Sequence, residues 1–252
     1  MARKLITPPT REPLSLEAAR KALRDPPEED NNEIQALIIA ARKYCENYQN
    51  RVYLEQTWEL WLDGWPRQKH IEIPLPPLQS VTYIRYYGTD DTEYTLDTGE
   101  YDVDTNGYVG RVVLKYLKTW PLVTLRPSSA VVVRFVAGYS TYASTVTVAN
   151  DTEVERTAGD EFNTDWQAGK AVSIAGSDYR LSSVTDADNL VLAADATDGA
   201  GQAFLADDVP EPFKQAMILH LKLLYDDYEP MLRDRMENAR DSLLSQERLM
   251  PV

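Results

Sequence analysis

The sequence contains very little of what reactive sites are built from. Its 252 residues include one cysteine, Cys45, and two histidines, His70 and His220. A single cysteine excludes an internal disulfide framework, and the lack of paired cysteines, of a His-Glu-x-x-His pattern and of a histidine cluster argues against a zinc or transition-metal site. Glycine-rich nucleotide loops and the Gly-x-Ser-x-Gly signature of hydrolases are also missing. We therefore expect no enzyme, no cofactor and structural roles for these three residues.

Long apolar runs and a targeting signal are missing as well. No apolar run is long enough to cross a bilayer as a helix, so no membrane contact is expected. The first thirteen residues, MARKLITPPTREP, are basic but lack the apolar stretch of a secretory signal. With three prolines and little periodicity, residues 1–13 are predicted to form an extended arm.

Basic residues are scarce in one part of the chain. The formal net charge is −14, and the segment from Thr141 to Asp207 holds twelve acidic residues against three basic ones. A surface of this kind repels phosphate, which argues against a protein that grips nucleic acid but permits one past which DNA slides. Solubility is the alternative interpretation of the same charge.

Helical periodicity marks both ends of the chain. Ser15 is a plausible N-cap for a first helix that Asp25 and the following prolines end. A second helix is predicted from the acidic stretch 28–32 to about Asn50. Near the C-terminus, a helix is predicted from residue 210 to 228, and a last one from about 230 to 247.

Between these helices the sequence alternates with a period of two. Turn residues separate short predicted strands, whose spacing indicates an antiparallel meander or a small sandwich. These strands are His70–Ile73, Ser80–Tyr87, Glu93–Leu96, Tyr101–Asp104, Arg111–Lys115 and Ala130–Ala137. The acidic segment 141–207 has strand signals of its own, at Ser144–Val148, Ala171–Ala175, Tyr179–Val184 and Asn189–Leu192.

These patterns predict an α+β fold. A helical hairpin and C-terminal helices would pack with an antiparallel β meander or sandwich, and a small all-β domain would be inserted. The predicted divisions are an arm at 1–13, a core of 14–140 with 208–239, an acidic β domain at 141–207, and a C-terminal tail at 240–252.

Three features of the sequence allow more than one interpretation. The aromatic run from Thr57 to Tyr87 could form a sugar-binding platform, but its exposed half suits a protein–protein contact. The pairs Asp102/Asp104 and Asp226/Asp227 could do acid–base work in a glycosidase, although such pairs are usually a solvated strand edge or helix face. The stretch 186–189 could hold calcium, but a plain turn fits better because the glycine and distal glutamate of an EF-hand loop are missing.

In order along the chain, several stretches resemble tailed-phage head–tail connector proteins, also called adaptor or head-completion proteins. They are LSLEAARKAL, EIQALIIAARKYCENYQNRVYLEQTWELWLDGWP, IEIPLPPLQSVTYIRYYGTD, YTLDTGEYDVDTNGYVGRVVL, VVVRFVAGY and VPEPFKQAMILHLKLLYDDYE. Each stretch is hydrophobic and structural, so the specificity lies in the ordered set, which covers nearly all of 14–140 and 208–250. The segment 141–207 departs from the compact members and resembles small β modules that recur in phage structural proteins.

The resemblance implies a virion protein at the head–tail interface, made in the host cytoplasm. It implies a homo-oligomeric ring of about twelve copies that binds the portal protein, extends the DNA channel without binding DNA specifically, and offers a platform to a tail-side connector or tail protein. Portal docking is expected through Leu243, Leu244, Arg248, Leu249 and Met250, unless these residues pack back on the protein's own helices. Subunit contacts are expected at Trp61, Trp65, Tyr86 and Tyr87. The alternative function is a virion or cell-surface module that recognises glycan or a receptor through the acidic β domain.

Overall fold

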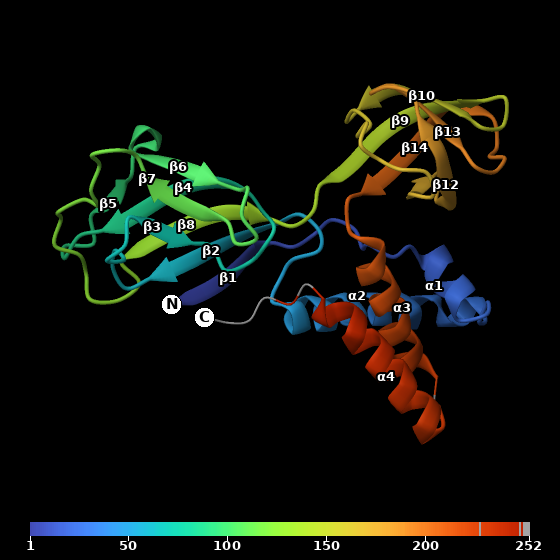
Figure 1. Ribbon diagram of the computed structural model, residues 1–252, viewed down its shortest axis with the longest axis horizontal. Coiled ribbons are helices and arrows are strands. Elements are labelled where there is room, and N and C mark those ends of the chain that lie inside the picture. The colour runs from blue at the N-terminus through green and yellow to red at the C-terminus, as the bar shows by residue number, and fades with distance from the viewer. Residues whose placement is uncertain (227, 247, 249–252) are drawn as a thin grey trace. The chain divides into compact units, whose positions relative to one another are not determined.

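The structure is a computed structural model that describes residues 1–226, 228–246 and 248 (Figure 1). Over this part of the chain it contains four α-helices and fourteen β-strands, arranged in antiparallel sheets and one closed barrel. The predicted α+β class is therefore confirmed. The chain divides into two compact units, which are Met1–Arg11, Lys43–Tyr139 and Leu244–Val252 for the first, and Glu12–Arg42 and Ser140–Leu243 for the second.

These units cut across the division expected from the sequence. Most of the helical residues group with the acidic β segment in the second unit, whereas the expected core would have joined the helices to the sheets. The chain crosses from one unit to the other inside two helices, which periodicity alone cannot reveal because a helix keeps its pattern across such a boundary.

The first unit is a sandwich of two sheets. A five-stranded sheet has the order β1-β2-β8-β4-β5, and a three-stranded sheet has the order β3-β7-β6. Their strands are β1 (Ala2–Thr7), β2 (Gln56–Leu62), β3 (His70–Glu72), β4 (Leu78–Tyr87), β5 (Glu93–Thr95), β6 (Tyr101–Asp104), β7 (Arg111–Leu114) and β8 (Val131–Ala137).

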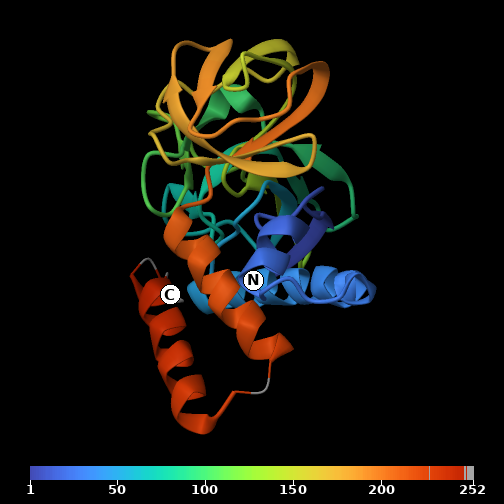
Figure 2. The ribbon, with the colours of Figure 1, turned by 90° about the vertical axis from the view of Figure 1, so that its right-hand side faces the viewer.

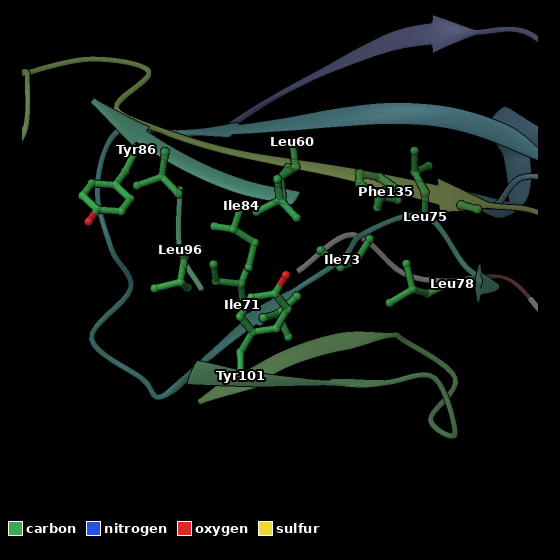
Figure 3. Packing of buried hydrophobic residues seen from close by; sticks show 14 of the residues in the cluster. Leu60, Ile71, Ile73, Leu75, Leu78, Ile84, Tyr86, Leu96, Tyr101 and Phe135 are labelled. Atoms are coloured by element: carbon green, nitrogen blue, oxygen red, sulfur yellow. The ribbon is translucent and has the colours of Figure 1, made fainter. Parts of the chain in front are cut away.

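Alternation along the strands builds the core between these sheets (Figure 3). Leu60 of β2, Ile84 of β4 and Phe135 of β8 point inward from one sheet, and Ile71 and Val112 from the other; all are buried. On β2, Trp58 and Leu62 pack on the same core, while Glu59 and Trp61 lie on the opposite face, as the period of two predicts.

The N-terminal arm is extended but is part of a sheet. Strand β1 pairs antiparallel with β2, from Ala2 opposite Trp61 to Thr7 opposite Thr57. Its side chains are mostly exposed, and this is why the sequence shows no apolar alternation there. Backbone pairing with an edge strand needs no particular side chain.

The second unit contains the acidic segment as a closed six-stranded barrel of order β10-β13-β12-β11-β14-β9 (Figure 2). Its strands are β9 (Thr141–Ala149), β10 (Glu153–Gly159), β11 (Ala171–Ile174), β12 (Ser177–Val184), β13 (Asn189–Leu192) and β14 (Gly199–Asp207). The inward side chains of Val146, Phe162, Val172, Leu181 and Phe204 fill the barrel. Closure removes the sheet edges that an open acidic sheet would expose.

The helices begin and end close to the predicted places. They are α1 (Leu16–Ala22), α2 (Asn31–Gln49), α3 (Glu211–Tyr225) and α4 (Pro230–Ser245), with a 3-10 turn at Glu28–Asp30. Ser15 is the predicted N-cap, and its Oγ accepts a hydrogen bond of 3.0 Å from the backbone N–H of Ala18. Cys45 is fully buried, as expected. α1 stops before Arg24 and Asp25, both of which have positive φ.

Candidate interaction surfaces

The acidic pairs that could have served acid–base catalysis, Asp102/Asp104 and Asp226/Asp227, make local contacts where the structure describes them. Asp104 pairs with Arg111 at 2.6 Å, and Asp102 lies 3.6 Å from Lys115. Asp226 accepts a hydrogen bond from the hydroxyl of Tyr228, while Asp227 lies outside the described residues. Within the described residues, no group of three or more His, Cys, Asp or Glu side chains could hold a metal ion. None of the helices in that part of the chain combines the length and apolar character needed to cross a bilayer.

The stretch 186–189 forms a turn built on Asp186. Its Oδ1 accepts hydrogen bonds of 2.8 Å from the backbone N–H groups of Asp188 and Asn189, which lower the pKa of the carboxyl. Asp188 pairs in turn with Arg156. The carboxylates of this turn therefore bind backbone N–H groups and the Arg156 guanidinium.

Glu59 organises the outer face of the five-stranded sheet. Its carboxylate lies 2.7 Å from a guanidinium nitrogen of Arg134 and accepts hydrogen bonds of 3.2 Å from Tyr83 Oη and Trp61 Nε1. The guanidiniums of Arg134 and Arg85 lie over the Tyr83 ring, at 4.9 and 4.1 Å from its centre. Burial raises the pKa of Tyr83. Trp61, one of the expected contact residues, is half-buried and held within this cluster.

The other expected contact residues lie in or beside an aromatic row. Trp120 stacks on Trp65 with ring centres 4.8 Å apart and an interplanar angle of 5°. Trp65 meets Tyr86 edge-on at 5.4 Å, and Tyr86 stacks on Tyr94 at 5.2 Å. Tyr86 is buried and Trp65 is half-buried, so these two side chains mainly hold the protein's own fold.

Tyr87 lies beside this row and is half-buried. Its hydroxyl donates a hydrogen bond of 2.8 Å to Glu93, and the Arg126 guanidinium lies 4.1 Å from its ring centre. Burial, followed by the hydrogen bond to Glu93, raises the pKa of the Tyr87 hydroxyl.

The sequence did not single out the most exposed apolar side chains of the first unit. They belong to residues 115–126, the first part of the connection between β7 and β8, which we name the apolar loop. Tyr116 is 91% exposed, Leu117 79% and Leu122 99%. The sequence signal that could have found them is the high proportion of apolar residues in 115–126, which is unusual for a segment with turn residues at both ends.

The apolar loop is held firmly although its tips are exposed. Trp120 Nε1 donates a hydrogen bond of 2.8 Å to the carbonyl of Gln68, and Lys118 pairs with Glu100 at 2.8 Å. The backbone N–H of Arg126 donates to the carbonyl of Tyr87 at 3.2 Å. Leu117 has a φ of +63°, a conformation that costs a non-glycine residue energy and tends to occur at functional sites.

A second feature of the first unit is an open hollow of about 470 Å³, which we name the Arg51 hollow. Its lining is Arg51, Pro76, Pro77, Gly107, Tyr108 and Tyr139. The Arg51 guanidinium binds the hydroxyl of Tyr139 and lies 4.9 Å from the ring centre of Tyr108. Tyr108 is 48% exposed, so aromatic and proline surface is accessible around a fixed cation.

The residues expected to dock with a portal differ in their environments. Leu244 is fully buried, and its carbonyl accepts a hydrogen bond of 2.9 Å from Gln49 Nε2 of α2, so it packs back on the protein's own helix. Leu243 is half-buried. Arg248 is exposed, with its guanidinium 4.6 Å from the ring centre of Tyr48. Leu249 and Met250 lie outside the described residues.

A further set of exposed apolar side chains flanks the connection between α3 and α4. Leu224 is exposed near the end of α3, and Met231 and Leu232 are exposed at the start of α4.

At the other end of α3, Asp208 anchors the barrel. It accepts hydrogen bonds from Trp166 Nε1 at 2.7 Å and Tyr142 Oη at 2.8 Å, and lies 3.5 Å from Lys170. Burial lowers the pKa of the Lys170 ammonium.

The sequence matches no protein-family model and no curated protein. The fold, however, is similar to that of chains in solved particles of a gene transfer agent (GTA). A chain in the virion of the native GTA particle matches with a TM-score of 0.60 at 14% identity. A chain in the neck of the empty particle, computed with C6 symmetry, matches with a TM-score of 0.61 at 13% identity. A chain in the neck of the native particle, computed with C12 symmetry, matches with a TM-score of 0.56 at 13% identity.

The chain shares the fold of these particle chains. Each match covers 100% of this chain and 97% of the other. The likeness therefore includes the barrel as well as the sheets and helices, and the barrel is part of the common fold.

Proposed function

We propose that the chain is a structural subunit of a viral head–tail connector ring. In this role it lies at the head–tail interface of a virion, binds the portal protein, extends the DNA channel and provides the platform for tail attachment. The observation that carries the proposal is the end-to-end likeness in fold to chains of GTA necks. Because that likeness includes the barrel, it supports a connector role for the whole chain over a separate glycan- or receptor-binding role for the barrel.

The surface of the protein supports the same role. A closed ring of identical subunits needs two different faces on each copy that fit one another. The chain has apolar side chains that a monomer leaves in water, among them Leu122 on the apolar loop and Met231 at the start of α4. The acidic barrel would repel the phosphates of passing DNA.

Portal docking is proposed for the last turn of α4 and the segment that follows it. Of the five residues expected to dock with the portal, Leu243 is half-buried and Arg248 is exposed. Leu249 and Met250 follow them in the sequence. Each docked leucine contributes about 1.5–3 kcal/mol, and ordering the peptide offsets much of it. Several weak tails held in one ring bind together by avidity.

The role is tested by deleting the gene in a strain that produces the particle. We expect heads that package DNA but neither retain it nor carry tails, and complementation with the wild-type chain should restore tailed particles. Imaging particles that carry a labelled copy should place density in the neck. Tailed, sealed particles formed without this chain would end the proposal.

Docking is tested by truncation after Gln246, which keeps α4 and the buried Leu244 intact. This variant should fold and assemble with itself, but it should not sediment with portal rings. Deletion from Arg240 is the poorer test, because it removes Leu244 from its contact with Gln49 and damages the fold as well. Portal binding that survives truncation after Gln246 would move the docking site elsewhere.

A further inference from the structure

The apolar loop and the Arg51 hollow lie at opposite ends of one strand. β8 runs from Val131, opposite Tyr86, to Ala137, opposite Leu78. The apolar loop leads through residues 127–130 into the start of β8, where the N–H of Tyr87 donates to the carbonyl of Ala130. The hollow lies at its end, where the N–H of Gly138 donates to the carbonyl of Pro77. Seven residues at about 3.3 Å each separate the two by roughly 20 Å.

The two features are complementary in chemistry. The loop presents Leu122, which is 99% exposed, directly after Pro121, and its backbone is fixed by the stacked Trp120. The hollow presents two proline rings and the exposed face of Tyr108. Its volume of about 470 Å³ lies in the range of clefts that bind ligands, about 300–1,000 Å³, and leaves room for a leucine side chain.

We propose that the apolar loop of one copy inserts Leu122 into the Arg51 hollow of a second copy of this chain. The contact is head-to-tail, because each copy offers its loop at one end of β8 and its hollow at the other. Contacts of this kind continue from copy to copy and close into a ring when the rotation between copies permits it. The inference rests on the proposed connector function, and the symmetric GTA necks with this fold support a ring as the product.

The rigid support of the apolar loop favours docking, and the presence of both the loop and the hollow on every copy is the reason for choosing a second copy as the occupant. An apolar loop that is rigid before binding loses little freedom when it docks. The exposed apolar surface, the rigid support and a matching hollow all lie within one compact unit, so every copy carries both halves of the contact.

Cross-linking of paired cysteines tests the contact. The variant carrying both Leu122→Cys and Tyr108→Cys is assembled into particle necks and treated with a short bis-maleimide. We expect a ladder of covalent multimers that ends at the closed ring. Each single variant should show no covalent multimers on a denaturing gel, and a mixture of the two single variants should stop at covalent dimers, because only one junction can be linked. Cys45 is fully buried, and the wild-type chain controls for its reaction.

A matched control places the second cysteine on another exposed side chain of the same unit. Val103 of β6 is 37% exposed and does not line the hollow. The pair Leu122→Cys and Val103→Cys should give no ladder. The variant Leu122→Asp, which loses the buried leucine, should reduce ring formation about ten- to hundredfold.

The outcomes separate this contact from the connector function. If the Leu122/Tyr108 double variant is itself present in necks but gives no ladder, the contact is wrong and the function stands. If the purified chain at high concentration gives the ladder but is absent from necks, the contact stands and the function falls. Cross-links from residue 122 to a different polypeptide would assign the loop to another partner and overturn the contact.

Discussion

Lys214 Nζ lies 2.9 Å from Asp207 Oδ1, and each side chain keeps only 9% of its surface exposed. The two residues join the last strand of the barrel to the first turn of α3. Asp207 Oδ1 also accepts a hydrogen bond of 3.0 Å from the backbone N–H of Val209. One carboxylate therefore neutralises a buried cation and fixes the chain where it leaves the barrel.

The variant Asp207→Ala should destabilise the second unit by about 3–5 kcal/mol, because it leaves the Lys214 ammonium buried without its partner. Urea unfolding followed by circular dichroism measures the loss. As a control, Glu237→Ala breaks the exposed pair with Arg233 and should cost at most about 0.5 kcal/mol. Similar losses of stability for the two variants would show that the buried pair stabilises the protein no more than the exposed pair does.

Gly138 is expected to be intolerant of any side chain. Its φ is +120°, and an added Cβ would lie 2.2 Å from the carbonyl oxygen of Leu54. Gly138→Ala should therefore lower stability by about 2–5 kcal/mol, from the strained backbone and the displaced strand together. Gly64→Ala is the matched control in the same unit, since nothing lies within 4 Å of its added Cβ. That variant should stay within about 0.5 kcal/mol of wild type, and equal effects of the two variants would contradict the packing argument.

The sequence predicts those strands whose signals are local. β6 and β13 begin and end where alternation and flanking turns place them, at Tyr101–Asp104 and Asn189–Leu192. β10 and β14 were missed. β14 is rich in glycine and alanine, which favour strands weakly, so its strand state depends on pairing with β9 and not on its own propensity. The same applies to β1, which is a strand because β2 offers an edge.

The sequence could predict that the protein has contact surfaces, but not which residues form them. An aromatic-rich strand region indicates contact surfaces, but which rings remain exposed is decided by distant partners. Trp65 is covered by Trp120, from the connection between β7 and β8, and Trp61 is held by Glu59 with Arg134 of another strand. The exposure of Leu122 likewise depends on where Trp120 finds its partner, which no local pattern specifies.

His220 should make the helices of the second unit sensitive to acid. Burial, and then the positive charge of Arg240, whose Nη1 lies 2.9 Å from His220 Nδ1, lower the pKa of the imidazole from 6.5 to about 4. The folded state therefore binds its proton more weakly than the unfolded state. The stability that this neutral imidazole contributes is present above pH 6.5 and is lost as the pH falls toward 4.

The measurement compares unfolding free energies of wild type, His220→Gln and His220→Phe between pH 7 and pH 4.5. Both variants should be less sensitive to acid than wild type across this window, because neither can take up the proton. Their two curves should run parallel even where their absolute stabilities differ. A wild-type curve parallel to both would show that His220 does not carry the effect.

The rigidity of the apolar loop should depend on Trp120. Its stacking on Trp65 and its hydrogen bond to the carbonyl of Gln68 each contribute about 0.5–1.5 kcal/mol. Losing both in Trp120→Ala should raise the population of the open loop about 5- to 140-fold. Trypsin cleavage after Lys118, which is held to Glu100 in the closed loop, reports that population.

The variant Trp120→Phe separates the two contributions, since it keeps a stacking ring but loses the indole donor. Its cleavage rate should fall between those of wild type and Trp120→Ala, and Tyr116→Ser, at a nearly fully exposed position, should cleave at the wild-type rate. If Trp120→Ala cleaves no faster than wild type, the loop is not held by its aromatic stack. The rigid support on which the head-to-tail contact depends would then have to come from the Lys118–Glu100 pair and the bond between the Arg126 N–H and the Tyr87 carbonyl.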